Sequence, residues 1–577
     1  MLHLNSPLLL FQFQPSCVDD ALEWRYTFCQ TAMQPRKIFR KLTSSKSQLY
    51  IFLALLLLIS LILTSGNPLP VAAQESEAEL DAVVETVFNA LTPDERVGQL
   101  FMVSFKGNNV KPGSDIAELI QQYRVGGVVI SAANRNFTNT LPRVSSSATL
   151  AQVVALTNGL QKLAQESSLQ TAADSLALTD NQDSTSTVAP TSTLTSSLGT
   201  DTAEPYTPIP LFIAVSHEGD GFPFTAIRGG MVDLPNQMAL GATWNVEYAR
   251  RTGAVVGQAL ALVGVNMLFG PSLDVLDNPR PERGGSLGTR TFGGHPFWVG
   301  ELGQAYIQGV HQGSQNKVLT IAKHFPGFGS SDREINQGVP TILKSLDDLR
   351  RTELLPFFKV THLNPDNPDQ ADGLTDGLMT AHIRYQGLQG NVPISLDARN
   401  LPTLLALKEI APWREAGGLV VSAPLAVPAA LEGIAAGAEN FPARRLAQDA
   451  FLAGSDILFV PDFAFKDRPE NELANLKNAI NFFREKYASD PNFQAAVDRS
   501  VRRIIRAKIK VYGPDLLTNK VENPVDNLEQ LRKLSLDLDQ IAQAGVSLIT
   551  PITQDGLTPL PGPPQPGDQI LIFTDDR

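Results

Sequence analysis

The sequence contains little cysteine, and the positions of its cysteines exclude several chemistries together. Only two occur in 577 residues, Cys17 and Cys29, and both precede the one long apolar run of the chain. If that run is an export segment, the mature protein has no cysteine. Disulfide frameworks, thiolate metal sites and cysteine nucleophiles are then excluded.

Positive charge is also scarce. The chain has 47 Lys and Arg against 59 Asp and Glu, a formal net charge of −12, and no long basic block in its body. Binding to a phosphate backbone needs such a block, so nucleic acid is not expected as a partner. Histidine pairs at metal-ligand spacing are absent, as is a glycine-rich phosphate loop ahead of a helix. We therefore expect no metal and no other cofactor.

The one long apolar run has the features of an export segment. It covers residues 49–63, follows a basic cluster that begins at Arg36, and precedes a stretch of small residues that ends at Ala73. Residues 1–73 are thus expected to be a cleaved signal or an uncleaved anchor, although the run is shorter than the about 20 residues that a spanning helix needs. Met33 is an alternative start. Both interpretations place the body outside the cytoplasm, secreted or anchored at the cell envelope, with membrane contact only through the anchor.

Short apolar runs alternate with longer amphipathic stretches through most of the body. Eight of these runs have the length of buried strands: 100–103, 126–130, 211–215, 265–269, 320–322, 378–383, 419–422 and 457–460. Helical periodicity separates most of them, as at 247–263, 298–312 and 346–360. Repeated strand and helix units indicate a parallel sheet, and eight of them favour a closed barrel. We expect the α/β class, with a TIM-type (β/α)8 barrel over residues 74–513.

Two segments depart from this rhythm. Residues 165–207 are rich in Ser, Thr, Asp and Ala without periodicity, which predicts a disordered insertion, or alternatively a glycosylated or regulatory loop. Residues 514–577 have the composition of a linker and the start of a second α/β domain, with a helix at 528–544 and apolar runs at 546–549 and 570–573. Because no sequence for a neighbouring strand follows the last apolar run, we expect this second domain to be truncated.

One motif directly follows the fifth predicted strand. The segment 323–329 (KHFPGFG) places Lys323 and His324 at the carboxyl end of a barrel strand, where active sites are built. It resembles the KHFPGHG motif of glycoside hydrolase family 3, in the bacterial β-N-acetylhexosaminidase branch. Other segments resemble the family in the same order: 91–102 (LTPDERVGQLFM), 210–219 (PLFIAVSHEG), 266–279 (NMLFGPSLDVLDNP), 290–293 (RTFG), 379–383 (MTAHI), 453–456 (AGSD) and 497–510 (VDRSVRRIIRAKIK).

The resemblance implies a carbohydrate partner, an amino-sugar glycan with β linkages. It carries sugar-binding roles over to polar side chains of this sequence: Asp274, Arg290, Lys323, His324, Glu218 and His382. Charged groups of this kind form strong hydrogen bonds with sugar hydroxyls. A structural ion pair is the alternative for Asp274 and Arg290, and an interior histidine is the alternative for His382. The role of Glu218 is left open in the same way.

The expected reaction centre departs from the family pattern. Retaining glycosidases need a carboxylate nucleophile and a carboxylate acid/base about 5 to 5.5 Å apart. Aligning residues 418–425 with the family's nucleophile segment puts Ala423 at the position of the nucleophilic aspartate. On the loop after the motif, Glu334 replaces an aspartate and Asn336 replaces the histidine of the branch's acid/base element, while Phe328 replaces the second histidine of the motif.

Two functions are compatible with these departures. The first is hydrolysis of β-linked N-acetylhexosamine or related glycans with unorthodox residues, for which Glu334 is the acid/base candidate and a solvated loop charge is the alternative. A substrate-assisted reaction normally needs a carboxylate to orient the acetamido group, and Ala423 has none. The second is a catalytically silent envelope protein that binds a glycan or a protein partner through the same pocket.

Overall fold

The computed structural model describes residues 71–139, 146–177, 208–220, 224–276, 287–333, 335–363, 372–432, 434, 438–516, 521, 523 and 536–546. The predicted export run, Glu334 and the predicted C-terminal runs beyond Val546 lie outside these residues. Within the described part of the chain, no helix has both the length and the apolar character needed to cross a membrane.

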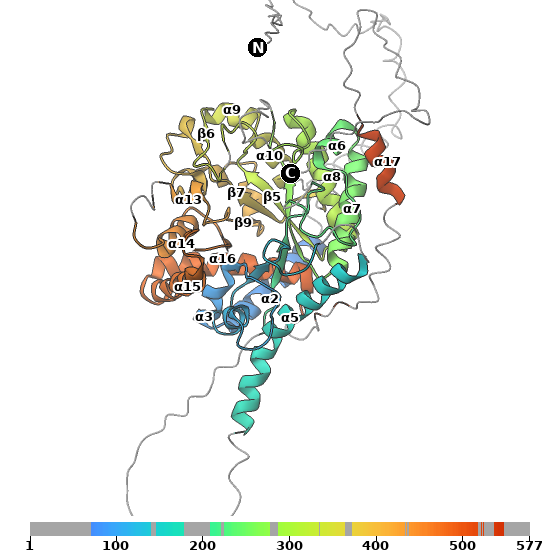
Figure 1. Cartoon of the computed structure of the whole chain (residues 1–577). Helices are drawn as coiled ribbons and strands as arrows, with labels where there is room; N and C mark the ends of the chain where they lie inside the picture. Colours follow the sequence, from blue (N-terminus) through green and yellow to red (C-terminus); the bar gives the residue numbers. More distant parts are fainter. Residues whose placement is uncertain are drawn as a thin grey trace, which may run out of the picture. The chain divides into compact units, whose positions relative to one another are not determined.

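Eight parallel strands form a nearly closed barrel (Figure 1). In barrel order they are β10 (Leu458–Val460), β1 (Phe101–Val103), β2 (Gly127–Val129), β3 (Phe212–Val215), β4 (Met267–Ser272), β5 (Leu319–Phe325), β7 (Gly377–Thr380) and β9 (Leu419–Val421). A parallel bridge between Val421 and Ile457 connects the two ends of this order. The eight predicted strands and the α/β barrel are therefore confirmed.

Helices surround the barrel (Figure 1). They are α2 (Val71–Ala90), α3 (Pro93–Gln99), α4 (Asp115–Gln121), α5 (Ser146–Ala177), α6 (Gln237–Ala242), α7 (Val246–Leu262), α8 (Pro296–Ser314), α9 (Leu346–Arg351), α10 (Leu354–Thr361), α11 (Asn400–Leu405), α12 (Ala411–Glu415), α13 (Pro428–Leu431), α14 (Ala443–Leu452), α15 (Glu472–Ser489), α16 (Pro491–Tyr512) and α17 (Leu536–Ala544). A small sheet pairs β6 (Thr341–Ile342) with β8 (Arg384–Tyr385).

Helix α3 shows how the local sequence sets an element boundary. Thr92 accepts a hydrogen bond from the backbone of Glu95, whose side chain in turn accepts one from the backbone of Thr92, and Pro93 takes the first helical position. This reciprocal capping satisfies backbone N–H groups that the first turn leaves without partners. The capping therefore fixes the start of the helix, which ends at Gln99, just ahead of β1.

The structure divides the helical stretch predicted at 346–360 into α9 and α10. The break falls at Thr352 and Glu353, where the fully buried Glu353 carboxylate accepts hydrogen bonds from Ser330 and Lys344. A buried ion pair to a separate loop thus interrupts a pattern whose periodicity alone is continuous. Helix α5 also continues through Ala177, into the predicted insertion, and residues 178–207 lie outside the described residues.

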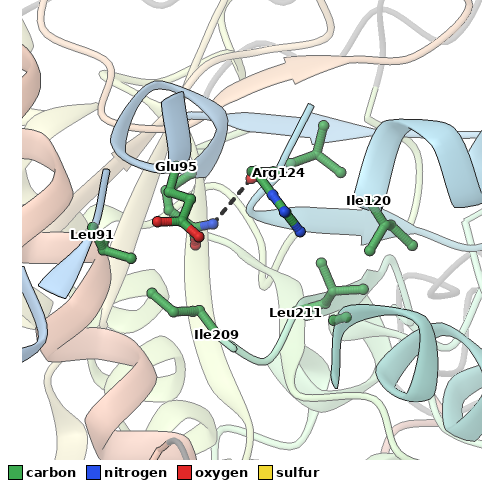
Figure 2. Close-up of a pocket in the computed structure, with 9 residues that line it drawn as sticks. Leu91, Glu95, Ile120, Arg124, Ile209 and Leu211 are labelled. Atoms are coloured by element: carbon green, nitrogen blue, oxygen red, sulfur yellow. Dashed lines mark hydrogen bonds between the residues drawn. The ribbon is translucent and has the colours of Figure 1, made fainter. Parts of the chain in front are cut away.

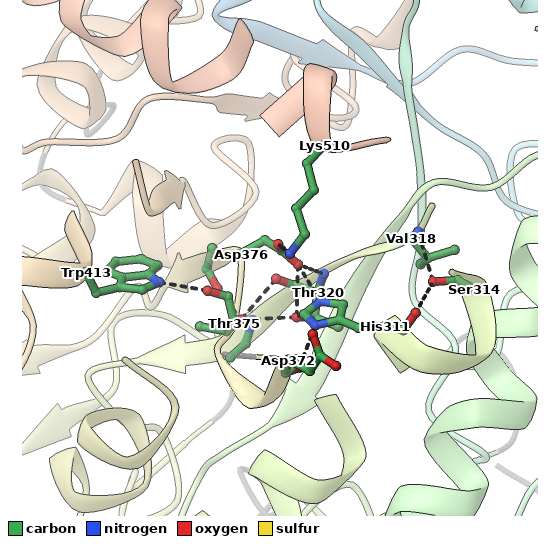
Figure 3. A network of polar contacts seen from close by, with 11 residues as sticks. His311, Ser314, Val318, Thr320, Asp372, Thr375, Asp376, Trp413 and Lys510 are labelled. Atoms are coloured by element: carbon green, nitrogen blue, oxygen red, sulfur yellow. Dashed lines mark hydrogen bonds and ion pairs between the residues drawn. The ribbon is translucent and has the colours of Figure 1, made fainter. Parts of the chain in front are cut away.

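A polar network fixes the amino ends of β5 and β7 (Figure 3). The ring of His311 on α8 lies between the backbone oxygen of Asp372, at 2.7 Å, and the carboxylate of Asp376, at 2.8 Å. Lys510 on α16 forms an ion pair with the same carboxylate, at 2.5 Å. Both ring nitrogens of His311 are thus engaged by the protein. The network connects α8 and α16 to the start of β7.

Candidate functional site

A cavity of about 340 Å³ opens at the carboxyl ends of the strands, a size typical of small-molecule sites. It brings together most of the predicted site residues, since its wall includes Glu218, Arg290, Lys323, His324, His382 and Ala423. Asp274 is not part of the wall. Glu334, the predicted acid/base candidate, lies outside the described residues.

Lys323 and Glu218, which both line the cavity, form a buried ion pair. Lys323 is on β5, Glu218 follows β3, and the ammonium group donates to Oε1 of the carboxylate. The second oxygen, Oε2, is buried without a hydrogen-bond partner. Glu218 is thus the one carboxylate among the described residues of the wall, and half of it is already engaged.

His324 is positioned by Asp274, which lies fully buried behind it. Nδ1 of His324 is 2.7 Å from Oδ2 of Asp274, and the backbone N–H of Phe328 donates to Oδ1 at 2.6 Å. Burial alone raises the pKa of Asp274, but the charge and hydrogen bond of His324, with those from Phe328 and Ser272, outweigh burial and lower it. Because a carboxylate only accepts, Nδ1 of His324 carries a proton, and Nε2 is the ring nitrogen left for a ligand.

Asp274 therefore forms neither the predicted sugar contact nor the alternative ion pair with Arg290. The guanidinium of Arg290 instead stacks on the ring of Phe224, 3.7 Å from its centroid, and both residues line the cavity. Stacking leaves the edge of the guanidinium, where its donors lie, available to oxygen acceptors. Phe224 was not predicted as a site residue, and no motif of the sequence pointed to it.

His382 has both ring nitrogens engaged by the protein. Nε2 lies 2.8 Å from the backbone oxygen of Pro424 and Nδ1 lies 2.6 Å from the hydroxyl of Ser395. The carbonyl can only accept, so Nε2 donates and Nδ1 accepts. Burial lowers the pKa of His382 to about 4, which keeps the ring neutral near pH 7. This geometry matches the interior-histidine alternative: His382 supports the wall at Pro424.

Position 423 presents a methyl group where the family alignment predicts a nucleophile. Ala423 follows β9 and is buried in the wall, and its backbone N–H donates to Oγ1 of Thr380 at 3.0 Å. Strands β9 and β3 lie halfway round the barrel from each other. Glu218, which follows β3, therefore lies on the opposite side of the barrel from Ala423, which follows β9.

Asp220 is a second carboxyl that the sequence did not single out. It follows Glu218 by two residues and accepts a hydrogen bond from Thr289, next to Arg290. Burial and the charge of Glu218 raise the pKa of Asp220, while the bond from Thr289 and the charge of Arg290 oppose this. Asp220 is therefore easier to protonate than an ordinary aspartate, although it does not line the cavity.

A cavity at the opposite end of the barrel is too small to hold a sugar (Figure 2). Its volume is about 10 Å³, room for a single water. It lies among Leu91, Glu95, Ile209 and Leu211, and Nε2 of Gln99 donates to the backbone oxygen of Arg124 beside it. Among the described residues, no cluster of three His, Cys, Asp or Glu could hold a metal ion.

A model of the glycosyl hydrolase family 3 N-terminal domain matches residues 92–507. The chain belongs to glycosyl hydrolase family 3. Within the family it is similar to the hexosaminidase-like branch, because curated relatives that it matches are named β-hexosaminidases. Family membership agrees with the barrel, and with an active-site end at the carboxyl ends of the strands.

Two curated relatives illustrate the likeness. β-Hexosaminidase A of Pseudoalteromonas piscicida is 25% identical over 496 residues, which cover 82% of this chain and 69% of the relative. A β-hexosaminidase of Thiobacillus denitrificans is 35% identical over 184 residues, 30% of this chain and 45% of the relative. The match thus spans less than half the length of the second relative.

Solved structures of the family show the same fold. A family 3 β-N-acetylglucosaminidase from Paenibacillus sp. superimposes with a TM-score of 0.53 at 24% identity, covering 79% of this chain and 68% of that one. A β-N-acetylhexosaminidase from Beutenbergia cavernae gives a TM-score of 0.50 at 20% identity, covering 72% of this chain and 98% of that one.

Proposed function

We propose that the cavity binds the terminal amino sugar of a β-linked glycan outside the cytoplasm, and that the chain does not perform the standard retaining reaction. One observation carries the proposal: the wall keeps cations suited to sugar hydroxyls but has the methyl group of Ala423 where a nucleophile is needed. The names of the hexosaminidase relatives support an amino sugar as the ligand.

The wall has the chemistry of a sugar-binding site. Arg290 supplies N–H donors, and His324 lines the cavity with Nε2 left for a ligand, because Asp274 engages Nδ1. The rings of Phe224 and Phe328 add apolar surface for the C–H face of a pyranose. Such a site binds hydroxyls by charge-assisted hydrogen bonds and excludes water around them.

The same wall lacks the parts of a double displacement. A covalent glycosyl intermediate needs a free carboxylate oxygen beneath the anomeric carbon, and a methyl group cannot form the bond. Glu218 is paired with Lys323, and freeing it would leave a buried ammonium without its counter-ion. We therefore expect binding without turnover.

Hydrolysis by unorthodox residues is the second candidate. It is supported by Oε2 of Glu218, a buried carboxylate oxygen that has no hydrogen-bond partner and belongs to a residue of the cavity wall. In that case Glu218, or Glu334 from the loop after the motif, would act on the substrate. This function predicts turnover that is lost on Glu218→Gln or Glu334→Gln.

The decisive experiment combines binding and turnover on the full chain. We expect calorimetry to detect binding of N-acetylglucosamine to the parent chain. Arg290→Ala should weaken this binding at least tenfold. The parent chain should not hydrolyse 2,4-dinitrophenyl β-N-acetylglucosaminide. Ala423→Asp should gain turnover of this substrate, whose leaving group needs no acid, and Ala423→Asn should not. Turnover by the parent chain overturns the silent function, and absence of any sugar binding overturns the pocket assignment.

Placement outside the cytoplasm rests on the sequence of residues 1–73. Cell fractionation of the full chain with a C-terminal tag tests it. We expect the protein in the envelope or medium, with Gln74 as the new N-terminus if the signal is cleaved. Recovery of the intact chain from the cytoplasm contradicts this placement.

A further inference from the structure

The fully buried carboxylate of Glu353 contacts the loop that follows β5, residues 326–333, here called the motif loop. Oγ of Ser330, on this loop, donates to Oε1 of Glu353 at 2.5 Å, and Nζ of Lys344 donates to the same oxygen at 2.5 Å. Nζ of Lys344 also donates to Oγ of Ser330 at 3.0 Å. The hydroxyl of Thr352 donates to the second oxygen, Oε2. Glu353, Lys344 and Ser330 thus form one cluster, here called the clamp.

The backbone of the motif loop also lies close to Glu353. Gly327 has a φ of 136°, and a Cβ at this position would lie 2.5 Å from Cβ of Glu353. The hydroxyl of Tyr385, on β8, donates to the backbone oxygen of Gly327. Glu353 therefore meets the motif loop at two points, the backbone of Gly327 and the side chain of Ser330.

Phe328 lies between these two points and contacts the site directly. Its backbone N–H donates to Oδ1 of Asp274 at 2.6 Å, and the centroid of its ring is 5.8 Å from that of His324. The rings of Phe328 and His324 belong to the wall of the cavity at the carboxyl ends of the strands. A shift of the motif loop would therefore move a donor away from Asp274, which in turn binds Nδ1 of His324.

The clamp itself lies outside the described wall of that cavity, since none of its three residues lines it. A buried ion pair adds little net stability over apolar residues of similar volume, because its attraction must first offset the loss of water around both charges. The ion pair between Glu353 and Lys344 is therefore weak evidence of a stabilising role. Its contact with the motif loop, two residues from Phe328, indicates a role at the site.

We propose that Glu353 is a positioning residue of the cavity, which acts through the clamp and the motif loop on Asp274 and His324. The clamp keeps the N–H of Phe328 on Asp274, and Asp274 keeps the proton of His324 on Nδ1, so that Nε2 is left for a ligand. The effect on sugar affinity rests on the proposed function. The effect on the His324 ring requires no sugar to bind.

Two variants of the clamp and one control variant test this role. Ser330→Ala removes the side-chain contact to the motif loop and leaves the ion pair of Glu353 in place, whereas Glu353→Gln removes the negative charge. Asp456→Asn is the matched control for lost stability. Asp456 is also a fully buried carboxylate with an ion pair, to Arg414, but it lies just before β10, at the opposite end of the barrel.

Three measurements are compared on the full chain. NMR of the ring nitrogens follows the Nδ1 signal of His324, calorimetry gives the affinity for N-acetylglucosamine, and urea unfolding gives the stability. We expect both clamp variants to shift the Nδ1 signal. Sugar affinity should fall about threefold for Ser330→Ala and about tenfold for Glu353→Gln, as for the loss of a neutral and of a charged hydrogen bond. Asp456→Asn should lower stability and change neither of the other two readouts.

Each outcome supports or overturns the role of Glu353. An unchanged Nδ1 signal in folded Ser330→Ala overturns it, and this variant alone decides if Glu353→Gln does not fold. Equal effects of Asp456→Asn on the signal or on sugar affinity also overturn it, because lost stability would then explain all three variants. A shifted signal with unchanged sugar affinity does the same. If the parent chain binds no sugar, the proposed function fails, and the Nδ1 signal still decides whether Glu353 positions His324.

Discussion

Glu218 and Lys323 form an ion pair in which both side chains are more than nine-tenths buried. They lie 105 residues apart in the sequence and come from β3 and β5, with β4 between them. The pair therefore connects two non-adjacent strands in the wall of the cavity at the carboxyl ends of the strands. It engages Oε1 of the one carboxylate in the described wall, whereas Oε2 has no hydrogen-bond partner.

The pair predicts strong coupling between two substitutions. Glu218→Gln or Lys323→Met alone should destabilise the fold by about 3–5 kcal/mol, because each leaves an uncompensated buried charge. The double variant should lose much less than the sum of the two. Urea unfolding of the four proteins measures the coupling, and additive losses would contradict a buried pair.

Asp274 is expected to position His324 without touching the ligand. Asp274→Asn should place an N–H group against donors from His324, Phe328 or Ser272 and cost about 1–3 kcal/mol of stability. Sugar affinity should fall at least tenfold. The readout that distinguishes positioning is the His324 tautomer, followed by NMR of its ring nitrogens. Asp94→Asn, on the exposed start of α3, is the control and should change neither.

Two buried histidines predict a pH dependence of stability. Burial lowers the pKa of both His217 and His382 from 6.5 to about 4. Between these values the unfolded chain binds more protons than the folded one, so stability falls as the pH drops from 6.5 towards 4, by about 2–3 kcal/mol for each residue. Thermal midpoints measured across this range should fall less steeply for His382→Gln than for the parent chain. An equal slope would show that His382 does not titrate as the structure implies.

The environment of Asp376 predicts a further loss of stability at more acid pH. Although burial opposes it, the charges of Lys510 and His311 lower the pKa of this carboxyl, so its stabilising effect disappears as the pH falls below about 4. Lys510→Met should cost about 1–3 kcal/mol at neutral pH and move acid unfolding to higher pH. Lys317→Met, at an exposed lysine near the end of α8, should do neither. Circular dichroism during acid titration compares the two variants.

The fold was largely predictable because each barrel strand is a short apolar run between longer amphipathic stretches. The eight runs and their order follow directly from that pattern. The break between α9 and α10 does not, since it coincides with a buried salt bridge between Glu353 and Lys344, which lies on the loop before α9. Hydrophobic periodicity indicates which face of a helix is buried. It does not indicate where a tertiary contact interrupts the helix.

The site was predictable in its residue types and less so in its orientations. The motif placed Lys323 and His324 in the cavity wall, and alignment identified Ala423 there. The sequence did not show that the Asp274 carboxylate binds His324 instead of lining the cavity, or that Arg290 stacks on Phe224. Those contacts depend on the conformation of the loops that follow the strands. The position of a residue in the sequence predicts only the strand end at which it lies, not the direction of its side chain.

Lys508 links the amino ends of early barrel strands to α16, which follows all of the barrel strands in the sequence. This fully buried lysine on α16 donates to Oε1 of Gln99 at 2.7 Å and to the backbone oxygens of Gly126 and Pro210 at 3.0 and 2.6 Å. Until α16 emerges from the ribosome, those oxygens have no such donor. During synthesis, the amino ends of β2 and β3 therefore lack this buried donor until α16, which follows the last barrel strand, has been made.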